Sequence, residues 1–122
     1  MTQRVLVVDD SALARRALRR ILEPEGYEVS EAEDGLIALE RYALERPDFV
    51  MLDLVMKGMY GLDVLTKLRQ LDPEARVLVV SADVQVSSHL LVAEAGAKGF
   101  VNKPFDREQI LQALDAAGAR VA

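Results

Sequence analysis

The sequence predicts an open, doubly wound α/β fold, and three observations lead to it. Short apolar runs rich in β-branched residues alternate with longer segments of helical period from one end of the chain to the other. Three of the five short runs (VLVV, FVML and VLVV again) are apolar on both faces, like the strands of a parallel sheet that helices cover on both sides. A closed barrel of this kind needs about eight strand–helix units, so five units indicate an open sheet.

The predicted strands are short, and helices fill the segments between them. In chain order the strands are Val5–Val8, Tyr27–Ser30, Phe49–Leu52, Val77–Val80 and Gly99–Val101. The first helix carries an apolar stripe at i, i+3, i+4 and i+7 (Ala14, Ala17, Leu18 and Ile21) and ends at Pro24 and Gly26. The later helices are predicted over Gly35–Glu45, Leu62–Leu71, Val84–Ala95, and from the N-cap Asp106 to near Gly118.

Composition excludes several classes of function. The 122 residues suit one domain over residues 1–122, and we expect no output domain. The absence of cysteine excludes thiol catalysis and Cys-ligated metals, and a single histidine, His89, excludes multi-histidine metal centres. A net charge of -5 has the wrong sign for binding nucleic acid. The N-terminus is neither a signal peptide nor a membrane span, so we expect a cytoplasmic protein that contacts no membrane and no nucleic acid directly.

Polar side chains follow four of the five predicted strands. Asp9 and Asp10 follow the first strand, Asp53 the third, Ser81 the fourth and Lys103 the fifth. Ligands of open α/β sheets bind outside the carboxyl ends of the strands, where the strand order reverses. In the flavodoxin-like order 2-1-3-4-5, that crevice lies between the first and third strands, where the three aspartates would meet. Alternation alone does not determine this order.

Three neighbouring carboxylates and a lysine suggest phosphoryl chemistry. Close carboxylates repel, so at least one pKa should rise unless a cation such as Lys103 is supplied. Carboxylate, water and backbone oxygens are the ligands of Mg²⁺, and an aspartate can act as a nucleophile that forms an acyl phosphate. A phosphoryl group on Asp53 would meet Mg²⁺, the Ser81 hydroxyl and the Lys103 ammonium, each offsetting charge on its oxygens.

Four stretches of the chain resemble the receiver domain of two-component response regulators, including its free-standing chemotaxis type. They are VLVVDDS at 5–11, MLDLVMKGMYG at 51–61, VLVVSAD at 77–83 and GAKGFVNKPF at 96–105. The resemblance covers essentially the whole chain. It implies a domain that accepts a phosphoryl group on Asp53 from a histidine kinase or a phosphotransfer protein.

The resemblance implies a metal site and two positions that adjust its chemistry. Asp10 and Asp53 would bind Mg²⁺ directly, together with the backbone carbonyl of Val55, and Asp9 would hold it through water. Val55 and Asp83 stand at positions that vary in the family and tune dephosphorylation.

The resemblance also implies a switch. Ser81 and Lys103 would contact the phosphoryl group, and the Lys103–Pro104 peptide bond would be cis. Phe100 takes the place of the switch aromatic, which in the family moves inward with the Ser81 hydroxyl on phosphorylation. Two loop positions depart from the family: Lys57 stands where proline is frequent, and Tyr60 where an acidic residue is common. Lys57 removes a rigid turn position and adds a positive charge near the pocket mouth.

For several other residues we expect a structural role rather than a direct part in the chemistry. The arginines of the first helix are expected to form a solvated face, with docking of an acidic or kinase partner as the alternative. His89 is expected on the surface of the fourth helix. Residues expected to pack in the core are Val84, Val86, Leu90 and Leu91 of that helix and Met51, Met56 and Met59.

Three functions from different classes remain. In the first, phosphorylation of Asp53 shifts a balance between two conformations, and the surface of the fourth helix, fifth strand and fifth helix reports it to a downstream protein. Such a switch is not an enzyme beyond self-phosphorylation and slow autodephosphorylation. The second is a Mg²⁺-dependent phosphohydrolase working through an aspartyl phosphate, although Val55 stands where such enzymes usually carry a second acid. The third is a phosphorylation-independent binding module, against which the intact acidic set argues.

Overall fold

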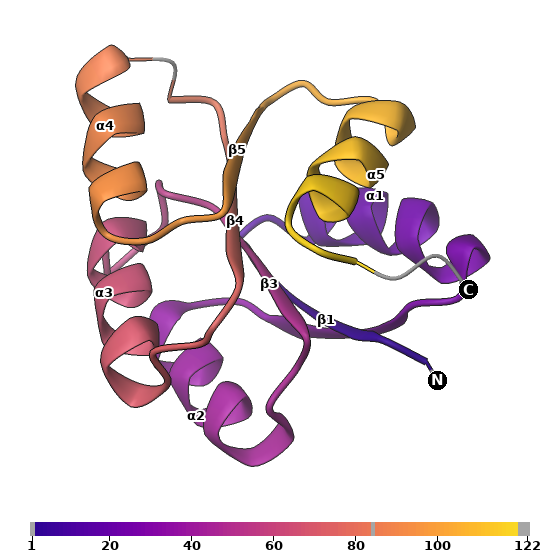
Figure 1. The fold of residues 1–122 in the computed structure, drawn as a ribbon, viewed down its shortest axis with the longest axis horizontal. Coiled ribbons are helices and arrows are strands. Elements are labelled where there is room, and N and C mark those ends of the chain that lie inside the picture. Colours follow the sequence, from indigo (N-terminus) through magenta and orange to yellow (C-terminus); the bar gives the residue numbers. More distant parts are fainter. Residues whose placement is uncertain (1, 84, 120–122) are drawn as a thin grey trace.

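The computed structural model describes residues 2–83 and 85–119, which form one five-stranded parallel sheet with helices on both faces (Figure 1). The strand order is β2-β1-β3-β4-β5, which confirms the flavodoxin-like prediction. The strands are β1 (Arg4–Val8), β2 (Glu28–Ala32), β3 (Phe49–Leu52), β4 (Val77–Ser81) and β5 (Gly99–Asn102). The helices are α1 (Ala12–Leu22), α2 (Gly35–Glu45), α3 (Gly61–Leu71), α4 (Val86–Glu94) and α5 (Arg107–Ala116), with a short 3₁₀ turn, η1 (Glu23–Glu25), after α1.

Two apolar layers hold the helices to the sheet. Alternate side chains of the central strands point to opposite faces, so that Leu6 and Val8 lie in one layer while Val5 and Val7 lie in the other. The helices α2, α3 and α4 cover the first layer, and α1 and α5 cover the second, as Figure 1 shows. Strands β1, β3 and β4 are buried on both faces, which explains their continuous apolar sequence.

Side chains at the predicted helix starts satisfy free backbone N–H groups. The carboxylate of Asp106 accepts from the backbone N–H of Gln109, and the Gln109 side chain accepts from the Asp106 N–H, which confirms the predicted N-cap. Ser11 and Asp34 cap α1 and α2 with the side chain of the N-cap residue alone, which accepts from a backbone N–H of the first turn. Because the caps of α1 and α2 follow β1 and β2 closely, the loops at the carboxyl ends of these strands are short.

The second strand lies later than predicted. β2 starts at Glu28 and continues to Ala32, because each of its residues pairs with β1, from Arg4 opposite Glu28 to Val8 opposite Ala32. Tyr27 belongs to the turn after α1, where its N–H donates to the carbonyl of Leu22.

The prediction for the fourth helix is wrong in two respects, apart from Val84, which lies outside the described residues. Val86, Leu90 and Leu91 are exposed rather than packed in the core, with 74%, 59% and 50% of their surface accessible. His89 is half-buried instead, and its ring stacks on Phe100 with the centroids 3.7 Å apart. Because apolar residues lie all around this helix, their spacing alone does not show which side faces the sheet.

The methionines pack as predicted. Met51 and Met56 are buried, and Met59 is partly buried against the layer that α2, α3 and α4 cover. Among the described residues, no helix is long and apolar enough to cross a membrane.

A buried tyrosine links two elements on the α2 and α3 side, and its removal gives the first prediction. The hydroxyl of Tyr42, on α2, donates to a carboxylate oxygen of Asp72 after α3, at 2.8 Å. This hydrogen bond is the main reason that the pKa of Asp72 lies below its ordinary value of 3.8. Tyr42→Phe should lower the free energy of unfolding by about 1–2 kcal/mol at neutral pH, measured by urea unfolding.

The pH dependence of this difference follows from the sign of the shift. A carboxyl group with a lowered pKa stabilises the folded state above its ordinary pKa, and that stabilisation is lost as the pH falls through the lowered value. The difference between the wild type and Tyr42→Phe should therefore shrink in acid. As the control, Tyr60→Phe alters an exposed tyrosine and should change the stability by less than about 0.5 kcal/mol. A loss at Tyr42 that is independent of pH would contradict the ionic role of this bond.

Candidate functional site

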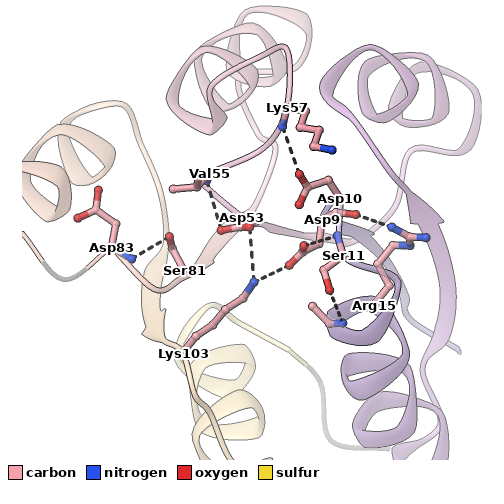
Figure 2. Close-up of polar contacts among 11 residues, drawn as sticks. Asp9, Asp10, Ser11, Arg15, Asp53, Val55, Lys57, Ser81, Asp83 and Lys103 are labelled. Atoms are coloured by element: carbon pink, nitrogen blue, oxygen red, sulfur yellow. Dashed lines mark hydrogen bonds and ion pairs between the residues drawn. The ribbon is translucent and has the colours of Figure 1, made fainter.

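The polar residues predicted from the strand ends gather at one edge of the sheet (Figure 2). Asp9 and Asp53 follow β1 and β3 directly, Ser81 is the last residue of β4, and Lys103 follows β5. Asp10 is next to Asp9 in the loop that leads to α1. Because β1 and β3 are neighbours in the sheet, the two loops that carry the aspartates lie side by side.

The three aspartates form a compact acidic cluster. One carboxylate oxygen from each of Asp9, Asp10 and Asp53 lies within 4.8 Å of the others. Asp9 and Asp53 are buried, whereas Asp10 is exposed at the pocket mouth. This set of oxygen donors, partly open to solvent, fits a divalent cation such as Mg²⁺, which binds through one or two carboxylates and keeps several waters.

Lys103 supplies the positive charge within the cluster. Its Nζ donates to Oδ2 of Asp9 at 2.7 Å and lies 3.5 Å from Oδ2 of Asp53. Burial alone would lower the pKa of Lys103, but its hydrogen bond to Asp9 and the nearby Asp53 charge raise it above its ordinary value. The ammonium is therefore fully charged at neutral pH. The Lys103–Pro104 peptide bond beside it is cis.

The surroundings of Asp53 shift its pKa in opposite directions. Burial raises the pKa of Asp53, and the neighbouring Asp9 charge raises it further, while Lys103 and the N–H of Val55 act in the other direction. The net effect places its pKa above the ordinary value of 3.8. Desolvation therefore destabilises the ionised carboxylate of Asp53, and a cation in the cluster would offset this cost.

Backbone groups hold the carboxylates in place. The N–H of Ser11 donates to Asp9 at 2.9 Å, and the N–H of Val55 donates to Asp53 at 3.3 Å. The N–H of Lys57 donates to Asp10 at 3.2 Å and joins the β3–α3 loop to the β1–α1 loop. Lys57 can make this contact because it has a backbone N–H group, which a proline at this position would lack.

A glycine allows the β3–α3 loop to fold back on Asp53. A Cβ atom at Gly61 would lie 2.5 Å from the Asp53 carbonyl oxygen and 2.5 Å from the Leu54 Cα. Both are backbone atoms, which cannot easily move aside, so α3 can begin this close to the cluster only with glycine at this position.

Other predicted site residues lie around the cluster without joining it. The Ser81 hydroxyl accepts from the N–H of Asp83 at 3.2 Å. The carboxylate of Asp83 points away from Asp53 in Figure 2 and accepts from the Ser88 hydroxyl at 2.7 Å, at the start of α4. Val55 has 61% of its surface exposed on the loop after Asp53. In this structure the Asp83 carboxylate therefore binds the first turns of α4 and not the acidic cluster.

Phe100 and His89 form the contact between β5 and α4. Phe100 is half-buried beside the layer that α4 covers, and the His89 ring lies nearly parallel to it, at 25°. The buried Nε2 atom of His89 has no hydrogen-bond partner among the residues that the structure describes. The prediction of a surface histidine missed this contact, because a lone histidine in an apolar helix carries no signal of its neighbour.

The arginines of α1 are also not simply solvated. Arg15 and Arg19 form ion pairs with Glu31 on β2, at 2.9 and 2.8 Å, whereas Arg16 and Arg20 are exposed. Sequence analysis missed these pairs because Glu31 is twelve or more residues away along the chain.

The fold and the edge cluster define a class of protein: a doubly wound α/β domain with an acidic pocket where its strand order reverses. Comparison with known proteins identifies the family. The chain belongs to the response regulator receiver domain family, whose model matches residues 5–115. Members of this family are signalling modules of two-component systems.

Individual relatives agree with this assignment. The chain is 40% identical over 116 residues to the chemotaxis protein CheY of Bacillus subtilis, covering 94% of this chain and 97% of that protein. It is similar to CheY in the CheX–CheY–BeF3–Mg²⁺ complex from Borrelia burgdorferi, with a TM-score of 0.93, 32% identity and coverage of 97% and 90% of the two chains. A response regulator from Burkholderia pseudomallei, solved with a phosphorylated aspartic acid, calcium ion and citrate, has a TM-score of 0.87 and 32% identity, with coverage of 94% and 69%.

Proposed function

We propose that this chain is a phosphorylation-dependent switch that accepts a phosphoryl group on Asp53 from a histidine kinase or a phosphotransfer protein. The observation that carries the proposal is the position of Asp53: its buried carboxylate lies beside those of Asp9 and Asp10, and 3.5 Å from the ammonium of Lys103. The relative with a phosphorylated aspartic acid supports the same chemistry.

The acidic cluster would hold Mg²⁺. Asp10 and Asp53 would bind it directly with the carbonyl of Val55, and Asp9 through water, a set that fits the three carboxylates within 4.8 Å. When bound, Mg²⁺ supplies positive charge that offsets the charge on the phosphoryl oxygens. The Mg²⁺ and BeF3 in the complex of the Borrelia relative support this assignment.

This chain would contribute two groups to the transfer step: the Asp53 carboxylate as the nucleophile and the Lys103 ammonium as a positive charge. A carboxylate oxygen of Asp53 attacks the phosphorus of a phosphohistidine, so that an O–P bond forms as the N–P bond breaks and the imidazole leaves. Lys103 lies 3.5 Å from Oδ2 of Asp53 before the transfer, and its ammonium would then contact a phosphoryl oxygen. The nucleophile is the ionised form of the Asp53 carboxylate, so no proton leaves Asp53 in this step.

Ser81 and Phe100 would carry the signal away from Asp53. The Ser81 hydroxyl accepts from the N–H of Asp83 in this structure, and that bond would break when the hydroxyl turns toward the phosphoryl group. Asp83 in turn holds Ser88 at the start of α4, and His89 of α4 stacks on Phe100. A change at Ser81 would therefore reach both α4 and β5.

The surface formed by α4, β5 and α5 would report the switch to a downstream protein. The exposed apolar residues Val86, Leu90 and Leu91 lie on its α4 part. Val86 and Leu90 are four residues apart and so share a side of the helix, and neighbouring exposed apolar groups favour contact with another protein.

Enzymatic turnover is the weaker alternative. A phosphohydrolase needs a general acid or base beside its nucleophile, but the residue two positions after Asp53 is Val55, which is apolar and 61% exposed. Val55 and Asp83 would tune only the slow loss of the phosphoryl group, by shielding or admitting water.

Incubation with a small phosphodonor tests the proposal, with intact mass as the readout. With acetyl phosphate and Mg²⁺ we expect a single phosphoryl adduct, and with a chelator in place of Mg²⁺ we expect almost none. Steady turnover of a phosphate monoester over many cycles would favour the phosphohydrolase instead. An unmodified mass under every condition would overturn the proposal.

A further inference from the structure

Arg15 of α1 connects three parts of the molecule around the acidic cluster. Its Nη1 donates to the backbone carbonyl of Asp9 at 2.7 Å (Figure 2). Its Nε donates to Glu31 of β2 at 2.9 Å. Only 15% of the Arg15 side chain is exposed. A guanidinium held this way cannot move freely, because its two bonds use different edges of one rigid plane.

The carbonyl that Arg15 contacts belongs to the peptide group between Asp9 and Asp10, the two aspartates of the β1–α1 loop. On the other side of Asp9, its N–H donates to the carbonyl of Ala32 on β2, at 3.1 Å. The Asp9 residue is thus fixed from both sides. A rotation of its carbonyl would carry the Cα of Asp10 with it, and so change the distance between the carboxylates.

Arg19 provides a comparison within the same network. Its Nε donates to the second carboxylate oxygen of Glu31 at 2.8 Å, but no contact joins it to the β1–α1 loop among those described. Burial would raise the pKa of Glu31, but the hydrogen bonds from Arg19 and Arg15 more than offset this and lower it, so Glu31 is ionised at neutral pH. Arg15 and Arg19 thus share one counter-ion, and only Arg15 reaches the cluster.

We propose that Arg15 is a positioning residue for the cation site: its bond to the Asp9 carbonyl holds Asp9 and Asp10 at the separation that a divalent cation requires. The inference rests on the proposed function, in which these aspartates bind Mg²⁺. It assigns to Arg15 neither a contact with the phosphoryl group nor one with the cation.

The direction in which the Mg²⁺ affinity changes when Arg15 is replaced distinguishes a positioning role from an effect of its charge alone. Arg15 is a cation near a cation site, so removing its charge should strengthen Mg²⁺ binding if charge alone mattered. If Arg15 positions the ligands, removing it should weaken binding instead. Outer-shell partners of metal ligands typically change metal affinity by about tenfold or more.

Calorimetric titration with Mg²⁺ alone, without a phosphodonor, tests the inference. We expect the wild type to bind, Arg15→Met to bind about tenfold more weakly, and Arg19→Met to stay within about twofold of the wild type. Arg15→Lys keeps the charge but cannot make both bonds, so it should also weaken binding. If Arg15→Met does not fold, the Mg²⁺ affinity of Arg15→Lys tests the positioning role instead.

Thermal unfolding of the same proteins separates positioning from a general loss of structure. Arg15→Met removes the ion pair with Glu31 and the bond to the Asp9 carbonyl, whereas Arg19→Met removes ion pairs with Glu31 and Glu23. Each variant therefore loses two contacts, and we expect similar stability losses but different Mg²⁺ affinities. Unchanged Mg²⁺ affinity in both Arg15 variants, or equal weakening in Arg19→Met, would overturn the inference while leaving the proposed function intact. A wild type that binds no Mg²⁺ would instead overturn the proposed function, and with it this role of Arg15.

Discussion

Lys103→Met should lower the free energy of unfolding by about 2–3 kcal/mol in the absence of Mg²⁺, measured by urea unfolding. The substitution leaves the carboxylates of Asp9 and Asp53, whose side chains are only 3% and 8% exposed, without their cation. The expected loss is below that for a fully buried pair because 22% of the Lys103 side chain is exposed. The variant should also lose most of its phosphorylation, since the ammonium would no longer offset charge on the phosphoryl group.

Two further measurements test the electrostatic cause of this loss. Without Lys103 the pKa of Asp53 should rise further. A carboxyl group whose pKa is raised in the folded state makes the protein less stable as the pH rises through that folded-state pKa. The deficit of Lys103→Met should therefore be largest at neutral pH, shrink in acid, and shrink on addition of Mg²⁺. Lys67→Met, at an exposed lysine of α3, is the matched control and should change little. A deficit that neither acid nor Mg²⁺ reduces would contradict the electrostatic explanation.

Asp53→Asn should abolish the phosphoryl adduct and yet stabilise the metal-free protein. The pKa of Asp53 is raised mainly by burial, so its ionised form destabilises the folded state at any pH above the folded pKa. An amide of nearly the same shape removes that charge and relieves the repulsion from Asp9. We expect a higher melting temperature than the wild type at neutral pH without Mg²⁺, with the difference vanishing in acid, where the wild-type carboxyl is neutral.

The control for this prediction is Asp48→Asn, which alters a carboxyl group far from the acidic cluster. Asp48 follows α2 and accepts from the backbone N–H of Arg4. This variant should keep the adduct and gain no stability. An adduct that survives Asp53→Asn, or a lower melting temperature in that variant without Mg²⁺, would contradict the account.

The sheet and its edge could be predicted because they depend on patterns that are local in the sequence. Runs such as Val5–Val8 are apolar on both faces, which requires helices on both sides. Once the strands are parallel, the residues that follow them must meet at one edge, so Asp9, Asp53 and Lys103 could be grouped without a structure. The order of the strands needed analogy with a known arrangement, because alternation is compatible with other orders.

The features that could not be predicted depend on contacts between distant residues. The orientation of α4 is set by the few side chains that reach the sheet, among them Val92, and not by the apolar residues Leu90 and Leu91, which are exposed. In the sequence Arg15 is one of four similar arginines, and its contacts with Glu31 on β2 and with the Asp9 carbonyl distinguish it from the exposed Arg16. The spacing of residues along a helix shows which of them share a side, but not what that side contacts.

Chemical localisation of the phosphoryl group shows directly whether Asp53 is the acceptor. After incubation with acetyl phosphate and Mg²⁺, borohydride reduces an acyl phosphate, converting the modified aspartate to homoserine, which peptide mass spectrometry can place. We expect homoserine at Asp53, with Asp9 and Asp10 left as aspartate. Homoserine at Asp9 or Asp10, or a phosphoryl adduct that resists borohydride, would contradict this expectation.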